Sequence, residues 1–282
     1  MHPPPSPSAL HPLCGPVEGW PARYWGPERL DPLAWRELAG LIDAGEEIEA
    51  LVAALAGVSS IADVGGGTGL LTRALAARVA PVIVVEPSAA QRAELPDDDA
   101  RIRSAAGRAE RVPLADGAVE AALATWVLQY TDDPDAAVGE LIRIARARVV
   151  IVQAAPDNDL VDVYNAEAAV AGLPRAHHGW LLARAAAALE AAGFSVELTV
   201  VPTRIVAAAG GATALADTLA RLHFAGHPAI ERMRAATEPL VAAKLAAGGG
   251  ALRDDGVVLV ARRASFDAAL RASLRTTESQ AP

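Results

Sequence analysis

Four glycines stand directly behind a short apolar segment that carries one acid. The segment is Ile61–Val64, its acid is Asp63, and the glycines occupy positions 65, 66, 67 and 69, with a helical pattern directly after them. Glycine allows positive φ and lets the backbone approach a ligand that a Cβ would hold off. The N–H groups at the start of the following helix then face that ligand. The stretch therefore predicts a strand, a tight turn and a helix that bind a nucleotide-like ligand.

The glycine spacing departs from the dinucleotide-binding fingerprint, which requires G-x-G-x-x-G. The position of its third glycine is Leu70 when the count starts at Gly65, and Thr72 when it starts at Gly67. Glu86 ends the next apolar segment, which is the place for a carboxylate that binds both hydroxyls of a ribose. A solvated acid at a strand end is the alternative, and an acid there does not by itself separate one ribose-containing cofactor from another.

Three segments resemble, in chain order, motifs of the class I S-adenosyl-L-methionine (SAM) dependent methyltransferases. The stretch Asp63–Gly69, which reads D-V-G-G-G-T-G, is similar to the first motif. The stretch Gly107–Leu114 is similar to the family's G-x-A-E-x-L-P-[FL] segment, and Thr125–Tyr130 resembles the end of its fourth strand. The resemblance covers about residues 61–152 and implies SAM as the cofactor, with S-adenosyl-L-homocysteine as its product.

The resemblance implies a role for each motif. Asp63 would bind the ammonium of the methionine moiety, or cap the glycine turn, or do both. Arg108 stands where the family often has an acid near the adenine amino group, so the backbone N–H groups of Arg108 and Ala109 would read the adenine edge instead. Backbone carbonyls near Thr125 would hold the methionine amino group. The predicted cofactor-binding residues are Tyr24, Asp63, Gly65, Gly66, Gly67, Glu86, Pro87, Gly107, Arg108, Ala109, Thr125, Trp126 and Gln129.

Several of these residues have a second interpretation. Trp126 either faces the transferred methyl or belongs to the core. Gln129 stands where many relatives have His, and because Gln cannot act as a base at neutral pH, it would orient the cofactor carboxylate or an acceptor. Tyr24 and Trp25 would close over the cofactor or simply pack.

Catalysis needs few dedicated groups, since methyl transfer from a sulfonium is an in-line displacement at an already activated carbon. A hydroxyl acceptor benefits from a base within hydrogen-bond reach, whereas a neutral amine can lose its proton later. The predicted candidates for a base or acceptor ligand are His177, His178 and Asp157, and the weaker ones are His223 and His227. The alternative for each histidine is an ordinary surface residue.

The elements that would position these residues alternate along the chain. Two helices, at 33–41 and 46–55, precede the glycine turn, and short apolar runs then alternate with helical patterns. We therefore predict an α/β fold: a Rossmann-like, doubly wound, mostly parallel seven-stranded sheet with N-terminal helices and helical insertions that form a substrate lid. The predicted strands are 61–64, 82–85, 101–105, 119–125, 148–153, 194–201 and 254–262.

The chain is predicted to hold a single domain, residues 17–265, between a disordered proline-rich tail (1–16) and a C-terminal tail (266–282). Residues 17–57 would form an N-terminal helical cap and residues 58–153 the SAM-binding core. The stretches 154–180 and 207–250 interrupt the alternation and follow strands whose C-terminal ends bind ligands in such folds. Both are therefore predicted to line the substrate pocket.

Composition narrows the possible partners. The net charge of −9 opposes a nucleic-acid substrate, because phosphate binding needs clustered basic side chains. Cys14 is the only cysteine, and neither a signal peptide nor an apolar run long enough to cross a membrane is visible. We expect a cytoplasmic monomer or homodimer that needs no membrane. No metal is predicted, because the acids at 97–99, 132–133 and 254–255 resemble solvated turns.

The predicted function is SAM-dependent transfer of a methyl group to a small molecule. The acceptor is predicted to be a hydroxyl of a specialised metabolite, as in bacterial natural-product or antibiotic biosynthesis, while nitrogen or carbon methylation stays open. The rivals are an NAD-dependent oxidoreductase and a SAM-binding protein without transferase activity. The broken glycine fingerprint and the single lysine, Lys244, oppose the first rival, because no Tyr-x-x-x-Lys pair is evident.

Overall fold

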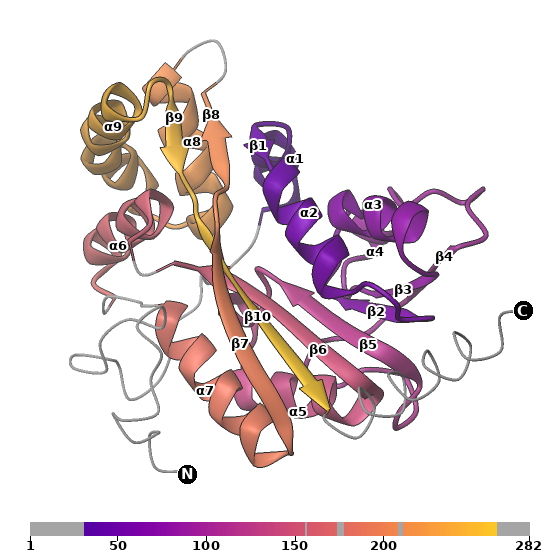
Figure 1. The fold of residues 1–282 in the computed structure, drawn as a ribbon. Helices are drawn as coiled ribbons and strands as arrows, with labels where there is room; N and C mark the ends of the chain where they lie inside the picture. The colour runs from indigo at the N-terminus through magenta and orange to yellow at the C-terminus, as the bar shows by residue number, and fades with distance from the viewer. Residues whose placement is uncertain (1–30, 156, 174–177, 208–210, 264–282) are drawn as a thin grey trace, which may run out of the picture.

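A computed structural model describes residues 31–155, 157–173, 178–207 and 211–263 of the chain. The main sheet has seven strands in the order β4-β3-β2-β5-β6-β10-β7 (Figure 1). The pairings among β2 to β6 are parallel, and β10 runs antiparallel to both of its neighbours. This order confirms the predicted Rossmann-like sheet. The strands are β2 (Ile61–Val64), β3 (Val82–Val85), β4 (Ile102–Ala105), β5 (Val119–Thr125), β6 (Ala145–Ala154), β7 (Phe194–Val201) and β10 (Gly256–Arg263).

Helices cover both faces of this sheet, which explains why its central strands read as continuous apolar runs. On one face, α2 (Gly45–Ala54) and α3 (Leu70–Arg78) pack on a cluster that includes Ile61 and Leu123. On the other face, α5 (Pro134–Ile144) and α7 (His178–Ala191) pack on a cluster that includes Ala62 and Ile151. Successive strand residues thus serve opposite cores.

Local signals in the sequence set the starts of several helices. The side chain of Asp133 accepts hydrogen bonds from two backbone N–H groups of α5, and Pro134 occupies the first helical position. Asp31 and Pro32 begin α1 (Pro32–Ala39) in the same way. The hydroxyl of Ser88 caps α4 (Ala89–Arg92). These ends depend on residues close in sequence, which is why sequence reasoning locates them.

A second assembly, which we call the cap, lies at one end of the main sheet (Figure 1). Its helices share a core that includes Leu38, Val163, Leu219 and Val241. They are α1, α6 (Asp159–Ala171), α8 (Gly211–Phe224) and α9 (Ile230–Ala247), and a small antiparallel sheet joins them, in the order β1 (Ile42–Asp43), β8 (Arg204–Val206) and β9 (Ala251–Arg253). The two helices predicted within 207–250 are α8 and α9.

The predicted last strand, 254–262, is corrected by the structure. Its pairing with β7 begins at Gly256, opposite Val201, and resumes beyond a break as β9 against β8, with Arg253 opposite Arg204. One antiparallel pair therefore runs from the main sheet into the cap and is interrupted at Thr203 and Asp254. The sequence gives no clear signal for β8 and β9, because each has only three residues.

Some predicted segments lie outside the described residues. They are the proline-rich tail, the aromatic residues at 20, 24 and 25, and the C-terminal tail. Among the residues that the structure does describe, no helix combines the length and the apolar character needed to cross a membrane.

Two glycines provide opposite tests of this packing. Gly139 lies exposed inside α5 with open space where a Cβ would stand, so Gly139→Ala should raise the free energy of unfolding by about 0.5 to 1 kcal/mol. At Gly248, which ends α9, an added Cβ would overlap the carbonyl oxygen of Ala251. Gly248→Ala should therefore lower the free energy of unfolding by about 1 to 3 kcal/mol. Urea unfolding measures both changes. Equal stabilities for the two variants would contradict the predicted course of the chain from α9 into β9.

Candidate active site

One cavity of about 430 Å³ lies where the main sheet meets the cap. This size suits a small-molecule site. One part of its wall, the glycine end, comes from β2 and from the segments after β2, β3, β4 and β5. The other part, the cap end, comes from the cap, from the break between the two sheets, and from Glu47 of α2 and Trp126. The glycine end includes Asp63, Gly65, Gly66, Gly67, Glu86, Pro87, Arg108, Ala109, Thr125 and Gln129, and the cap end includes Glu47, Trp126, Tyr164, Thr203, His223 and Asp254.

Asp63 lies buried beneath the glycine turn. Its Oδ2 accepts a hydrogen bond from Thr72 Oγ1 at 2.5 Å, and a Cβ on Gly66 would lie only 2.6 Å from the same oxygen. A Cβ on Gly65, whose φ is +76°, would lie 2.5 Å from Val127 Cγ2. Asp63 Oδ1 is buried and has no hydrogen-bond partner among the described residues. Burial, reinforced by the nearby Glu86, raises the pKa of Asp63 to about 6.

Glu86 is held rigidly at the end of β3. Its Oε1 accepts from the Ser88 N–H at 2.8 Å and its Oε2 from the Gly67 N–H at 3.3 Å. Burial raises its pKa, although the two backbone donors oppose that effect. Each carboxylate oxygen has a second lone pair. The carboxylate can therefore accept two further hydrogen bonds.

The segment after β4 turns tightly through a bridge between Arg108 and Arg111. The guanidinium of Arg108 forms an ion pair with Asp132 at 2.6 Å and a longer one with Glu110 at 3.4 Å. Arg108 and Ala109 line the cavity, but Gly107 is not part of the wall. A Cβ on Gly107 would lie 2.5 Å from Pro113 Cδ, so this glycine is required for packing of the turn.

Trp126 has an unusual backbone conformation directly after β5. Its φ is +58°, in the left-handed region, which is strained for a bulky residue and is common at functional sites. Its indole Nε1 donates to the two carboxylate oxygens of Glu47 at 3.2 and 3.1 Å. The strain is thus coupled to a contact that joins the main sheet to α2.

The cap end contains two buried acids, Glu47 and Asp254, which are 2% and 5% exposed. Thr203 links them, because its hydroxyl donates to Glu47 Oε2 at 3.3 Å and its carbonyl accepts from the Asp254 N–H at 2.8 Å. Burial raises the pKa of Glu47 to about 7 and that of Asp254 to about 8, and Glu47 adds to the second effect. Neither carboxyl has an ion pair with a basic side chain in the part of the chain that the structure describes. Asp254 is therefore not the solvated turn residue that the sequence predicts.

A histidine and a glutamate meet at the same end. His223 of α8 is 6% exposed and lines the cavity, and its Nδ1 lies 2.8 Å from Oε2 of the fully buried Glu167 of α6. The ring of Tyr164 packs edge-on against the imidazole, with centroids 4.9 Å apart. His223 is one of the two weaker sequence candidates, and Glu167 was not predicted.

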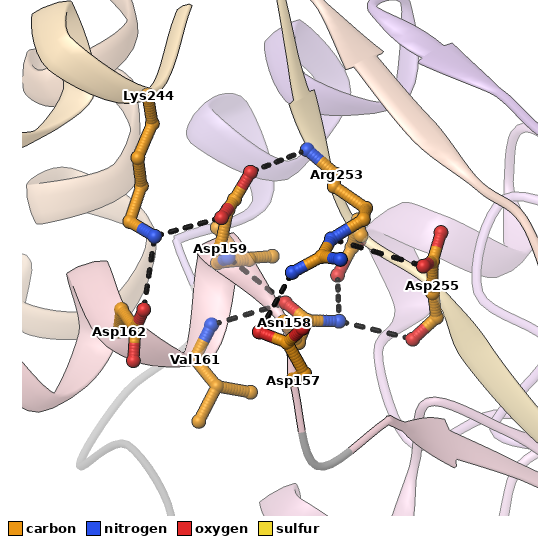
Figure 2. A network of polar contacts seen from close by, with 10 residues as sticks. Asp157, Asn158, Asp159, Val161, Asp162, Lys244, Arg253 and Asp255 are labelled. Atoms are coloured by element: carbon orange, nitrogen blue, oxygen red, sulfur yellow. Dashed lines mark hydrogen bonds and ion pairs between the residues drawn. The ribbon is translucent and has the colours of Figure 1, made fainter. Parts of the chain in front are cut away.

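Of the first-choice catalytic candidates, only Asp157 has a described side chain. Asp157 is exposed, outside the cavity wall, and forms an ion pair with Arg253 at 2.7 Å (Figure 2). The reason is local: Asn158 caps α6 through its Oδ1, and its amide donates to Asp254 Oδ1 at 3.0 Å, while Asp157 lies on the outer side of this junction. His178 begins α7, but its side chain is not described, and both His177 and Tyr24 lie outside the described residues.

The sequence carries a partial signal for the two buried acids that it was not used to predict, Glu47 and Glu167. Glu47 shares a helical face with Leu51 and Ala54, and all three are buried. Glu167 lies beside buried Tyr164 and Ala168 in the same way. An acid within an apolar helical stripe is therefore the pattern that could have revealed both. Thr203 and Asp254 have no such signal, because their burial depends on long-range strand pairing.

No group of three or more acidic, histidine or cysteine side chains suited to a metal ion occurs among the described residues. Residues 62–152 match the sequence pattern of a family described as "Methyltransferase domain". This match spans the glycine turn, Glu86 and β5 with Trp126 after it. This part of the chain is therefore similar to a methyltransferase domain.

Solved structures of other proteins have the same fold over most of this chain. The Bacillus subtilis protein YcgJ is 15% identical, with a TM-score of 0.55, over 77% of this chain and 97% of that one. A protein from Anabaena variabilis, assigned as a methyltransferase from an antibiotic biosynthesis pathway, is 19% identical, with a TM-score of 0.55, over 76% and 95%. Phosphoethanolamine N-methyltransferase 2 of Haemonchus contortus, solved with S-adenosylhomocysteine, is 14% identical, with a TM-score of 0.53, over 82% and 56%. No curated protein sequence matches the chain.

The buried acids of the cavity should make stability depend on pH. Because the pKa values of Glu47 and Asp254 are raised to about 7 and 8, the folded chain binds more protons than the unfolded chain between about pH 4 and 8. Their contribution to the free energy of unfolding should therefore fall as the pH rises through that window. Glu47→Gln and Asp254→Asn should each be more stable than the parent above about pH 8, by roughly 1 to 3 kcal/mol.

Urea unfolding from acidic to alkaline pH measures these differences. Asp98→Asn, at an exposed turn, is the matched control and should follow the parent at every pH. If the variants of Glu47 and Asp254 were less stable than the parent by the same amount at every pH, protonation of these two carboxyls would not be coupled to folding.

Proposed function

We propose that this chain binds SAM at the glycine end of the cavity and transfers its methyl group to a small molecule at the cap end. The observation that carries the proposal is the buried Asp63 Oδ1 without a partner, at the wall of a cavity that continues into the cap. A buried carboxylate oxygen in that state is costly unless a ligand donates to it. The ammonium group of a methionine moiety is such a donor.

The other residues of the glycine end fit the same cofactor. The fixed carboxylate of Glu86 has lone pairs for two ribose hydroxyls, and Gly65 and Gly66 line the cavity beside it. Arg108 has its guanidinium engaged by Asp132 and Glu110, so recognition of the adenine would use the backbone at Arg108 and Ala109. When bound, SAM supplies a methyl group already activated on a sulfonium. The protein then has to align an acceptor with that carbon and exclude water.

The acceptor is proposed to be a small molecule with a hydroxyl group, as in specialised metabolism. The modest volume of the cavity favours a metabolite over a macromolecule. The Anabaena variabilis structure, assigned to an antibiotic biosynthesis pathway, supports the same setting. A cytoplasmic location and a monomeric or homodimeric state remain predictions.

A nitrogen acceptor is the second candidate, and one observation favours it. Glu47 and Asp254 are buried carboxyls at the cap end that lack a basic partner in the described parts of the chain. An amine-containing acceptor would supply the missing positive charge. If so, Glu47→Gln should raise the KM for the acceptor about 10-fold or more while leaving the affinity for S-adenosylhomocysteine unchanged.

The position of the single lysine, Lys244, argues against an NAD-dependent oxidoreductase, because this side chain lies outside the cavity. Lys244 Nζ lies 2.7 Å from Asp159 and 2.9 Å from Asp162, which ties α9 to α6, and it is not part of the cavity wall (Figure 2). Isothermal titration with S-adenosylhomocysteine and with NAD separates the two functions. Binding of NAD alone would overturn our proposal. Incubation with labelled SAM and metabolite mixtures then separates a transferase from a protein that only binds SAM.

Cofactor affinity should depend on two carboxylates. Asp63→Asn and Glu86→Gln should each weaken binding of S-adenosylhomocysteine about 10- to 100-fold, because each removes a charge-assisted hydrogen bond. Glu49→Gln is the control, since Glu49 forms an exposed ion pair with Arg78 and lies outside the cavity. Isothermal titration gives the three affinities. Unchanged binding in both Asp63→Asn and Glu86→Gln would place the cofactor elsewhere.

A further inference from the structure

The two helical insertions each contribute one member of a buried polar pair. Glu167 comes from α6, in the stretch that follows β6, and His223 comes from α8, in the stretch that follows β8. They meet at 2.8 Å, with Glu167 fully buried and His223 open only to the cavity side of α8. The chain therefore places an imidazole and a carboxylate in direct contact where the acceptor would bind.

The contact determines which ring nitrogen is available. Nδ1 is engaged by the Glu167 carboxylate, so Nε2 is the nitrogen that remains for a ligand. If Nδ1 carries the proton and donates it to Glu167, Nε2 has a lone pair and can accept a proton. The edge-on ring of Tyr164 and the neighbouring Phe224 restrict rotation of the imidazole. This is the arrangement of a general base and the carboxylate that orients it.

A purely structural role explains the pair less well. Glu167 Oε1 is buried and has no partner among the residues described, so the carboxylate is only half satisfied. Apolar side chains of similar volume would join α6 to α8 at least as stably as such a pair. A carboxylate held in this state is useful when the imidazole beside it becomes positively charged.

We propose that His223 is the general base for a hydroxyl acceptor and that Glu167 is its positioning residue; this inference rests on the proposed function. The acceptor oxygen forms a bond to the methyl carbon while the carbon–sulfur bond breaks, and the bonding pair stays on sulfur in neutral S-adenosylhomocysteine. The hydroxyl proton passes to His223 Nε2. The imidazolium, paired with Glu167, releases that proton to solvent after the product leaves.

The charged surroundings of His223 are few and can be named. From α6 it faces Glu167 and Tyr164, and Tyr130 and Asp254 lie further along the cavity wall. The charged contacts of α8 with α1 and α9 involve Arg221 and Asp217, which pair with Glu37 and Arg234 on another face of the helix. If a substitution of Glu167 alone changes the acidic limb of the pH profile of kcat, that limb can therefore be assigned to His223.

The decisive measurement needs no acceptor. Long-range ¹H–¹⁵N spectra of the protein saturated with S-adenosylhomocysteine should show His223 with a proton on Nδ1 and none on Nε2 at neutral to alkaline pH, with the signals assigned by their loss in His223→Asn. In Glu167→Gln, the carboxylate no longer selects one tautomer, so a proton on Nε2 should become detectable in the neutral imidazole. A proton on Nε2, or an imidazole that stays doubly protonated at alkaline pH, would overturn the proposal.

Kinetics with labelled SAM provide the second measurement, with 4-ethylphenol and 2-naphthol as hydroxyl probes. His223→Asn should lower kcat about 100-fold or more with little change in KM, and should remove the acidic limb of the pH profile. Added imidazole should restore part of the rate to His223→Ala. His227→Asn is the matched control, since His227 lies beyond the end of α8 and outside the cavity wall, where its Nδ1 accepts from the Ala229 N–H.

The outcomes separate the two proposals. Failure of the parent protein to bind S-adenosylhomocysteine would overturn the proposed function itself. Normal binding with an unchanged pH profile in His223→Asn, or a rate loss that imidazole does not restore and that matches a loss of folded protein, would overturn only the role of His223. If neither phenol is methylated, the protonation state of Nε2 decides alone.

Discussion

The interruption of one antiparallel strand pair is the constraint on which the cap end of this protein depends. β7 and β10 continue into the cap as β8 and β9, but the pairing breaks between Val201 and Arg204 on one strand and between Arg253 and Gly256 on the other. A single backbone bond, from the Asp254 N–H to the Thr203 carbonyl, crosses the break. An unbroken ladder would direct these side chains above and below a sheet. The break instead lets Thr203 and Asp254 face the cavity.

That break explains why so many polar groups are buried at the cap end. Thr203 donates to Glu47, Glu47 accepts from the strained Trp126, and Asp254 accepts from Asn158, which in turn caps α6. α6 carries Glu167 to its contact with His223. Each link satisfies one group and fixes the next, so the positions of α2, α6 and the main sheet are determined together. Desolvated carboxyls are unfavourable for folding, and their retention here is best explained by binding or catalysis.

The sequence predicts the main sheet well because its signals are local or periodic. Ile61–Val64 is apolar except for Asp63 and is followed by glycines. Asp133 and Pro134 are an N-cap and a first helical residue, which together indicate the start of a helix. The glycine end follows directly, since Asp63 and Glu86 lie at predicted strand ends. The cap end does not follow, because Asp254 and Thr203 are far apart in the chain and meet only through strand pairing. Asp157 is predicted as a catalytic candidate because it follows a strand, but Asn158 is the residue that caps α6, and this leaves Asp157 on the surface.

The two ends of the cavity also differ in what fixes their chemistry. At the glycine end, local backbone geometry sets the arrangement, because a Cβ at Gly65 or Gly66 would overlap Val127 or Asp63, and the two carboxylates are held by backbone or hydroxyl donors. At the cap end, side chains from segments more than 50 residues apart must meet, as His223 and Glu167 do. A backbone cradle tolerates changes in the surrounding sequence, whereas such a side-chain constellation changes with each substitution in the cap. Acceptor choice can therefore vary on this fold while the glycine end stays the same.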